Sequence, residues 1–313
     1  MPELPDVVVY IEALEARVLN RTLENIRIAS PFVLRSVDPA PSTLLGKKVR
    51  AIRRLGKQIV FVFDGEHFLV IHLMIAGRLQ WRERHASLTG KIGLAAFDFD
   101  SGTLILTEAG SKKRASLHIV RGEHALKTFD RRALEVLESS LEDFQSILRR
   151  ENHTLKRSLT DPRLFSGIGN AFSDEILHHA KLSPMKQTSR MSAEEVRQLW
   201  ASTRSVLAEW VARLRTQTGN EFPSKVTAFR PEMAVHGRFG KPCPRCGAPV
   251  QRIVYAENEC NYCAPCQTEG RLLADRAISR LLKEDWPRSL EEMEKHIEER
   301  RGNSGSGTSN PEF

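Results

Sequence analysis

All five cysteines of this 313-residue chain lie between positions 243 and 266. Four of them form two Cys-x-x-Cys pairs, Cys243 with Cys246 and Cys263 with Cys266, and sixteen residues separate the pairs. This spacing is typical of a zinc site in which each pair supplies two thiolates. Four thiolates close a tetrahedron around the metal and leave no open position for catalysis. The sequence therefore predicts one structural zinc ion that stabilises a small hairpin.

The fifth cysteine leaves the ligand set open on spacing alone, because Cys260 and Cys263 also form a Cys-x-x-Cys pair. Pairing Cys263 with Cys266 keeps the two halves of the site symmetric, so we expect Cys260 to lie outside it. The first 242 residues contain no cysteine, which favours a reducing, cytoplasmic location. By itself the metal site predicts a zinc ribbon. It does not identify what the ribbon binds, which could also be a protein.

Composition narrows the class of protein further. Hydrophobic residues make up 41% of the chain and charged residues 27%, as in soluble globular proteins. No apolar run reaches the roughly 18 residues that a membrane helix needs, and no signal-peptide pattern opens the chain. The formal net charge of +8 favours a polyanionic partner, although many basic proteins are merely soluble. We expect a monomer that does not associate with membranes.

The pattern of apolar residues predicts a β-rich first part behind one helix. Helical spacing of apolar residues predicts a helix over 5–19, and alternation predicts strands from about 25 to 120. Turn residues at 64–65 and 100–102 separate pairs of these strands. We expect an antiparallel β-sandwich or barrel.

Beyond residue 130 the pattern is helical. It predicts helices over 133–148 and 171–180, and a long helix after the capping box of Ser192 and Glu195. A last helix is expected near 272–282, after the cysteines. The tail 302–313 is rich in Gly and Ser and has the composition of a linker and cloning scar, so no fold is expected there.

Three polar features have an ordinary structural explanation as well as a functional one. The turn Gly167-Ile168-Gly169-Asn170 precedes a helix, so its N–H groups could bind phosphate, or its glycines could simply make a corner. The run Lys112-Lys113-Arg114 could contact a polyanion or be a solvated loop. Glu3 could be catalytic or could only complement a helix dipole.

In order along the chain, several segments together resemble the formamidopyrimidine-DNA glycosylase and endonuclease VIII family. They run from Pro2 to about Leu282, and the opening is nearer to the formamidopyrimidine branch. The segments are Pro2-Glu3-Leu4-Pro5-Asp6-Val7, Arg54-Leu55-Gly56-Lys57, His72-Leu73-Met74-Ile75-Ala76-Gly77, Leu155-Lys156 with Asp161, Gly167-Ile168-Gly169-Asn170 with Ser173-Asp174-Glu175, and Val235-His236-Gly237-Arg238.

This resemblance implies an α+β multidomain fold. A β-sandwich domain with a leading helix would span 1–130, and a helix–two-turn–helix domain that binds DNA would span 131–230. A four-cysteine zinc finger with a terminal helix would follow over 231–285, and 286–313 would be a largely disordered tail.

The resemblance also implies base-excision DNA repair by a bifunctional enzyme, a DNA glycosylase and abasic-site lyase, on double-stranded DNA with a damaged base or abasic site. Pro2, exposed by removal of Met1, would attack the sugar and form a Schiff base, and β,δ-elimination would cut the strand. An α-amino group has a pKa near ~8, against ~10.4 for lysine, so much more of it is free base at pH 7. Glu3 would be the general acid, and Lys57 would hold a phosphate near the lesion. The alternative is a damaged-DNA binding protein of this fold with little or no excision.

Further residues are implied to contact DNA. His72, Lys156 and Asn170 would position phosphates. Met74 or Ile75 would fill the space left by the flipped base, with Arg114 as a second wedge.

The chain departs from the family pattern at four places. No aromatic residue remains in 108–114, Asn258 stands where the family has an arginine, Asp6 replaces a glutamate, and residues 217–230 differ from the loop that covers the lesion. These changes affect how a lesion is held and chosen. The elimination chemistry is expected to remain.

Overall fold

The structure is a computed structural model, and its contacts divide the chain into two compact units. The first unit combines Met1–Arg150, Leu159–Gly169 and Thr203–Ala228. The second combines Glu151–Ser158, Asn170–Ser202 and the chain from Phe229 on. Residues described by the structure are 1–88, 90–110, 112–223, 226–227, 229–255, 258–273, 287–293 and 295. Both units combine segments that are separate in the sequence, and the domain boundaries expected from the resemblance stay predictions.

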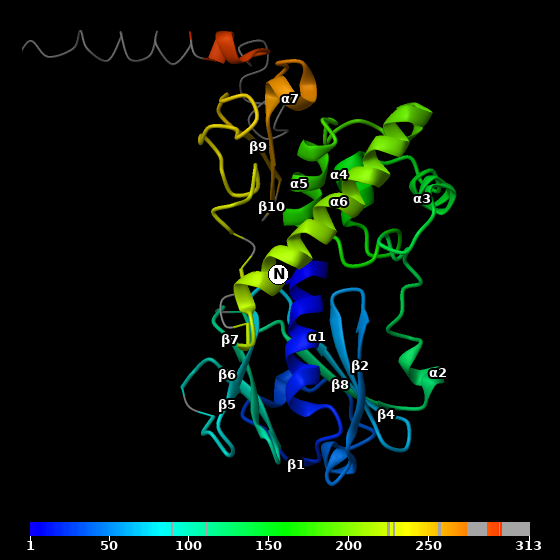
Figure 1. Cartoon of the computed structure of the whole chain (residues 1–313), viewed down its shortest axis with the longest axis vertical. Coiled ribbons are helices and arrows are strands. Elements are labelled where there is room, and N and C mark those ends of the chain that lie inside the picture. Colours follow the sequence, from blue (N-terminus) through cyan, green and yellow to red (C-terminus); the bar gives the residue numbers. More distant parts are fainter. Residues whose placement is uncertain are drawn as a thin grey trace, which may run out of the picture. The chain divides into compact units, whose positions relative to one another are not determined.

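Two four-stranded antiparallel sheets form most of the first unit (Figure 1). One sheet has the order β1 (Leu23–Ile28), β6 (Gly93–Phe99), β7 (Gly102–Glu108) and β5 (Gly77–Arg82). The other has the order β2 (Val49–Leu55), β3 (Gln58–Phe63), β4 (His67–His72) and β8 (Ser116–Arg121). Both sheets contribute to one buried apolar core, which confirms the expected sandwich.

The strands end where turn residues allow the chain to reverse. Strands β3 and β4 pair as far as Phe63 and His67, and Gly65 in the turn has a φ of 70°, which glycine adopts without strain. Strands β6 and β7 pair as far as Phe99 and Gly102. Both expected hairpins are therefore confirmed.

Helix α1 (Leu4–Val18) packs against β2 and β3. Val7, Leu14 and Val18 are fully buried on one face, in the core that the two sheets share. At its start a capping box is closed by the Glu3 N–H, which donates to Asp6 Oδ2 (2.9 Å). The predicted helix over 5–19 is confirmed.

The predicted helix over 133–148 is only half right, because α3 spans Leu141–Leu148. Leu134 instead pairs its backbone with the segment before the glycine turn, donating to Leu164 O (2.9 Å) and accepting from Ser166 N (3.0 Å). Ser140 then caps α3 by accepting from Asp143 N (3.1 Å). A tertiary backbone pairing has replaced the first two helical turns.

Shorter elements complete the first unit. They are the 3-10 turns η1 (Pro31–Val33) and η2 (Pro41–Leu44) and the helical turn α2 (Glu123–Leu126).

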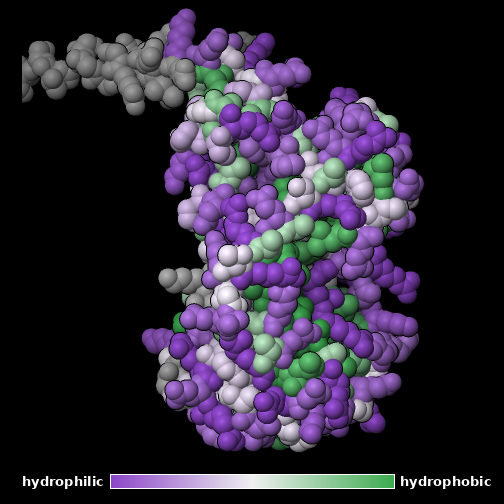
Figure 2. All heavy atoms as spheres, viewed as in Figure 1, coloured by the Kyte–Doolittle hydropathy of each residue, from purple (hydrophilic) through white to green (hydrophobic). Residues whose placement is uncertain are grey.

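Hydrophilic side chains cover most of the surface visible in Figure 2, in keeping with the charged composition.

Helical segments and a zinc-ribbon-like hairpin make up the second unit. Its elements include α5 (Asn170–His179), the 3-10 turn η3 (Thr188–Arg190), the hairpin β9 (Gln251–Tyr255) and β10 (Asn258–Tyr262), and α7 (Ala264–Thr268). Helices α4 (Leu155–Thr160) and α6 (Ala193–Thr218) begin in this unit and end in the first. Ser192 and Glu195 form the predicted capping box of α6. Helix α5 packs against β10.

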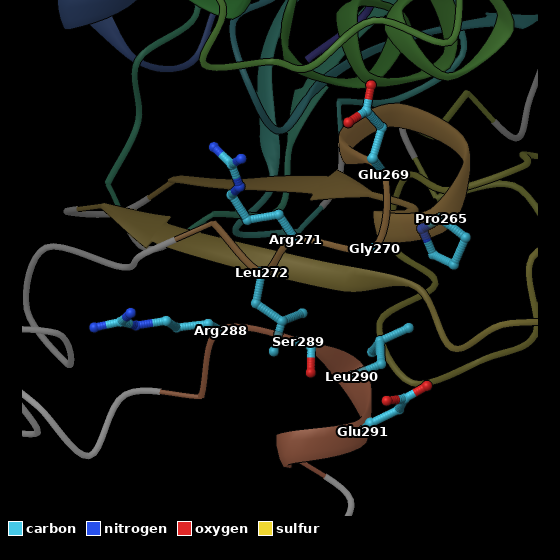
Figure 3. Close-up of a pocket in the computed structure, with 9 residues that line it drawn as sticks. All are labelled: Pro265, Glu269, Gly270, Arg271, Leu272, Arg288, Ser289, Leu290 and Glu291. Atoms are coloured by element: carbon cyan, nitrogen blue, oxygen red, sulfur yellow. The ribbon is translucent and has the colours of Figure 1, made fainter.

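Near the end of the described chain, residues 287–293 return to the hairpin. The Leu272 N–H donates to Arg288 O (3.0 Å), and Arg271 and Ser289 form an antiparallel bridge. These segments line a pocket of about 730 Å³. In Figure 3 its two arginines extend to one side, and Glu269 and Glu291 lie on the other. The helix expected near 272–282 falls mostly on 274–286, outside the described residues.

No helix in the described part of the chain is long and apolar enough to span a membrane.

Candidate active site and metal centre

The start of α1 is held by the glycine turn of residues 166–169, and both belong to the first unit. The Gly169 N–H donates to Glu3 Oε2 (2.6 Å), and the Leu4 N–H donates to Gly167 O (2.9 Å). Glu3 is only 3% exposed, so its carboxylate is a buried charge held by hydrogen bonds. The Gly169 N–H thus fixes the position of Glu3. This role differs from both interpretations of the turn that the sequence offered, a phosphate-binding loop and a corner that only requires glycine.

Lys57 reaches the same point, at the start of β3. A Cβ built on Gly169 would lie 2.5 Å from Glu3 Oε1 and 2.6 Å from Lys57 Nζ. The carboxylate and the ammonium group therefore lie against the same backbone atom, where only glycine fits. The structure brings together two of the predicted catalytic residues, Glu3 and Lys57, through a third residue whose role the sequence did not reveal.

Pro2 is buried beside Glu3, and Met1 precedes it. Burial lowers the pKa of the Met1 amino group; nearby Glu3 opposes this effect, and Arg78 reinforces it. Asp6 raises that pKa and Lys57 lowers it to a smaller degree. The environment at this terminus thus favours an amine in its neutral, nucleophilic form.

Lys57 and Met1 also line a pocket of about 310 Å³, together with His72 at the end of β4. Burial lowers the pKa of His72 to about 4, and the positive charges of Lys57, Arg131 and His118 lower it further. At neutral pH His72 is therefore uncharged, so it can offer a ligand a hydrogen bond but no positive charge.

An ion-paired arginine supports the glycine turn from behind. Arg54 Nη1 donates to Ser166 Oγ (3.0 Å) and to Gly56 O (2.9 Å), and its Nη2 pairs with Glu135. Glu135 Oε1 in turn accepts from Ser166 Oγ (2.5 Å). Sequence reasoning missed Glu135 and Ser166, because nothing in the sequence connects residues so far apart along the chain.

Two neighbouring loops of the first unit carry the predicted wedge residues. Gly77 pairs with Glu108 at the ends of β5 and β7, and a Cβ on Gly110 would lie 3.4 Å from Ala76 Cβ. Ile75 is 57% exposed at the tip of its loop, and Met74 is half-buried with a φ of 53°. Exposure therefore favours Ile75 over Met74 as the side chain able to enter a base stack.

Arg114 is held at its backbone by a buried carboxylate. Glu108 is 1% exposed and accepts from the Arg114 N–H through Oε1 (3.0 Å) and Oε2 (2.9 Å), and from Ala115 N (3.1 Å). Lys113 Nζ donates to Glu108 O. The loop that replaces the family's aromatic segment is thus closed on itself, with a fixed position for Arg114.

In the second unit, Lys156 is more enclosed than its expected role suggests. It is 5% exposed, and its Nζ donates to Asn170 O (2.7 Å) and to Asp174 Oδ1 (2.6 Å). Asp174 Oδ2 is 2.8 Å from His236 Nδ1 and accepts from Asn261 N (3.2 Å). Lys156 therefore belongs to a buried network centred on Asp174, and its contact with phosphate stays a prediction.

Asn170 links α5 to the hairpin, because its Nδ2 donates to Glu259 O (2.9 Å). Asn258 is the first residue of β10, and its side chain lies outside the described part. The adjacent Glu175 holds the segment before the cysteines by accepting from three successive N–H groups, those of Ala234 (2.7 Å), Val235 (2.9 Å) and His236 (2.9 Å). Burial raises the pKa of Glu175. The three hydrogen bonds oppose this shift, and the neighbouring Asp174 adds to it.

Four thiols converge in the second unit. The Sγ atoms of Cys243, Cys246, Cys263 and Cys266 all lie within 4.8 Å of one another. The Cys243–Cys266 distance is 4.0 Å and the Cys246–Cys263 distance is 3.4 Å. Thiolates at 2.3 Å from a tetrahedral zinc ion would be about 3.8 Å apart, so this geometry fits the metal.

Cys260 lies outside this group, as predicted. Its side chain is 2% exposed in the apolar cluster around Ile253 and Tyr262. Burial raises the pKa of its thiol, and the neighbouring Asp174 raises it further. The four cysteines expected from symmetry therefore lie together in the structure, and their binding of zinc stays a prediction.

Comparison with known proteins identifies the family. Residues 1–115 match the formamidopyrimidine-DNA glycosylase N-terminal domain, and residues 134–221 match the H2TH domain of the same enzymes. A formamidopyrimidine-DNA glycosylase of Solibacter usitatus is 30% identical over 271 residues, which cover 85% of this chain and 99% of that protein. The chain belongs to the formamidopyrimidine-DNA glycosylase family.

Solved structures of the family agree with the fold. The crystal structure of the MutM (Fpg) protein from Thermus thermophilus matches with a TM-score of 0.71 and 30% identity, over 85% of this chain and 98% of that one. The Lactococcus lactis Fpg bound to DNA with an abasic site matches with a TM-score of 0.75 over 85% and 99% of the two chains; at 24% identity it supports the fold alone. The predicted enzyme class, a DNA glycosylase, is thus confirmed for the family to which this chain belongs.

Proposed function

We propose that this family member is a bifunctional DNA glycosylase and abasic-site lyase that acts on damaged double-stranded DNA. The observation that carries the proposal is the buried Glu3 carboxylate, next to Pro2, fixed by Gly169 and adjacent to Lys57. An N-terminal amine, a positioned acid and a cation at one point are the groups that base excision through a covalent intermediate requires.

The reaction begins once Met1 has been removed. The Pro2 nitrogen attacks C1′ of the damaged nucleotide, the bond from C1′ to the base breaks, and the base leaves with the electron pair and gains a proton. The Glu3 carboxylate takes the proton that the Pro2 nitrogen loses in this attack and passes it to the ring oxygen, so the sugar opens and an iminium ion links Pro2 to C1′. Loss of a C2′ proton then expels the 3′ phosphate, and a second elimination expels the 5′ phosphate.

Residues on both units would hold the DNA, each by a separate contact. Lys57, His72, Lys156, Asn170 and Asn258 would lie near phosphates, and Ile75, Met74 and Arg114 would fill the space of the flipped base. Membership in the formamidopyrimidine-DNA glycosylase family supports DNA as the partner.

A zinc ion held by Cys243, Cys246, Cys263 and Cys266 completes the proposal. Four thiolates leave the ion no open position, so its role is structural. It stabilises the hairpin that follows the segment held by Glu175.

Borohydride trapping tests the lyase directly. Protein with a processed N-terminus, incubated with abasic-site duplex DNA and sodium borohydride, should form a covalent adduct whose mass maps to the Pro2 peptide. Protein that retains Met1 should form none. A lesion-dependent gel shift without adduct or strand cleavage would instead establish the alternative, a damaged-DNA binding protein.

A further inference from the structure

The pocket beside Lys57 contains more positive charge than the proposed reaction has used. It lies within the first unit and encloses about 310 Å³. Its lining includes two cations, Lys57 and Arg131, with the imidazole of His72, and Asp130 is its one acidic lining residue. Such a pocket attracts an anion.

The proposed reaction assigns no role to Arg131. Its side chain is exposed, and within the described part of the chain it forms no ion pair or hydrogen bond. Asp130, next to it, accepts from the backbone N–H of Arg132 (2.8 Å) and so closes the local turn. Arg131 and His72 line the same pocket, and the charge of Arg131 adds to the effects of burial and Lys57 that lower the pKa of His72 to about 4.

A second polar group of the pocket also lacks a partner. Gln58 lines it, and its buried Oε1 atom has no hydrogen-bond partner among the described residues. A carboxamide can turn so that its NH₂ group replaces its oxygen, and it then becomes a donor. A phosphate offers only acceptor oxygens, which suits two cations, an amide and an imidazole N–H.

We propose that Arg131 is a phosphate-binding residue, and that it holds one phosphodiester of the damaged strand in this pocket together with Lys57. This inference rests on the proposed function, since DNA supplies the phosphate. It adds a residue that the sequence did not reveal, because Arg131 lies between the β-rich segment and the predicted helices, where no motif was recognised.

The chain offers a matched control in the next residue. Arg132 is also exposed and charged, and it does not line the pocket. We therefore compare R131Q and R132Q in binding a duplex that carries a tetrahydrofuran abasic-site analogue, at several salt concentrations. Loss of one phosphate contact should reduce the slope of log K against log [salt] by about 0.9 in R131Q. The slope of R132Q should equal that of the wild type. Equal slopes in all three proteins, or equal losses in both variants, would overturn the proposal.

Neutral methylphosphonate linkages locate the phosphate. Substituted one at a time near the analogue, one linkage should weaken wild-type binding and cause a smaller loss in R131Q, because there only the Lys57 contact is left to lose. Additive losses at every linkage would overturn the assignment. Binding requires no chemistry, so these results are separate from trapping: adduct formation with unchanged R131Q binding rejects only this inference, and Arg131-dependent binding without an adduct rejects only the lyase.

Discussion

At the scale of single residues, Gly169 is the position on which the proposed chemistry depends most. Its φ lies outside the left-handed region, so an alanine is compatible with the backbone there. The new methyl group would nevertheless lie 2.5 Å from Glu3 Oε1 and 2.6 Å from Lys57 Nζ, so one of these groups must move. Displacement of a catalytic group by about 1 Å can cost a hundredfold in rate.

We therefore expect G169A to slow borohydride trapping about a hundredfold. The rate is measured under single-turnover conditions on abasic-site duplex DNA, with the thermal unfolding midpoint as the control for folding. A variant that traps at the wild-type rate would show that Glu3 and Lys57 need not keep these positions.

Residues differ in how far the sequence reveals them. The roles of Pro2, Glu3 and Lys57 were predicted from the family resemblance, because each lies in a segment with a recognisable pattern. Glu135 and Ser166 could not be found, since their roles arise only when Arg54 pairs with both of them across the fold. Partners brought together by tertiary structure carry no local signal.

At the scale of elements, local signals predicted structure well where nothing overrode them. The capping box before α6 and the apolar stripe of α1 gave the correct helices, because both signals act within a few residues. The helix prediction for 133–140 was wrong, because the backbone of Leu134 pairs with residues 164 and 166. The hydrogen bonds from the Arg114 backbone to Glu108 carried no local signal and became known only from the structure.

The cysteine hairpin gives a prediction at this scale. We expect the wild type to purify with roughly one zinc ion per chain and the C246S variant to purify without it, because three thiolates close the site poorly. Cys246 is exposed, so this change removes little packing. The C260S variant is the matched control and should retain its zinc, measured by elemental analysis. Equal loss of metal in both variants would place Cys260 among the ligands.

At the scale of the whole molecule, charge links stability to the DNA partner. The chain carries +8, and the pocket around His72 concentrates positive charge within the first unit. Without a ligand, the positive groups around this pocket therefore repel one another, and a bound phosphate would relieve this repulsion. Burial and neighbouring cations keep His72 neutral in the folded protein, whereas in the unfolded chain it titrates at its ordinary value of 6.5.

This difference predicts how stability depends on pH. Between pH 6.5 and about 4 the unfolded chain binds a proton at His72 that the folded chain does not, so stability falls as the pH falls through this window. One such group contributes at most about 1.4 kcal/mol per pH unit. In H72Q the loss of stability from pH 7.5 to pH 5, measured from urea unfolding midpoints, should be smaller than in the wild type. Because His118 and the other histidines remain in both proteins, the difference isolates His72. Parallel pH profiles would mean that His72 titrates alike in the folded and unfolded chains, and that the cations around its pocket do not act on it as the structure indicates.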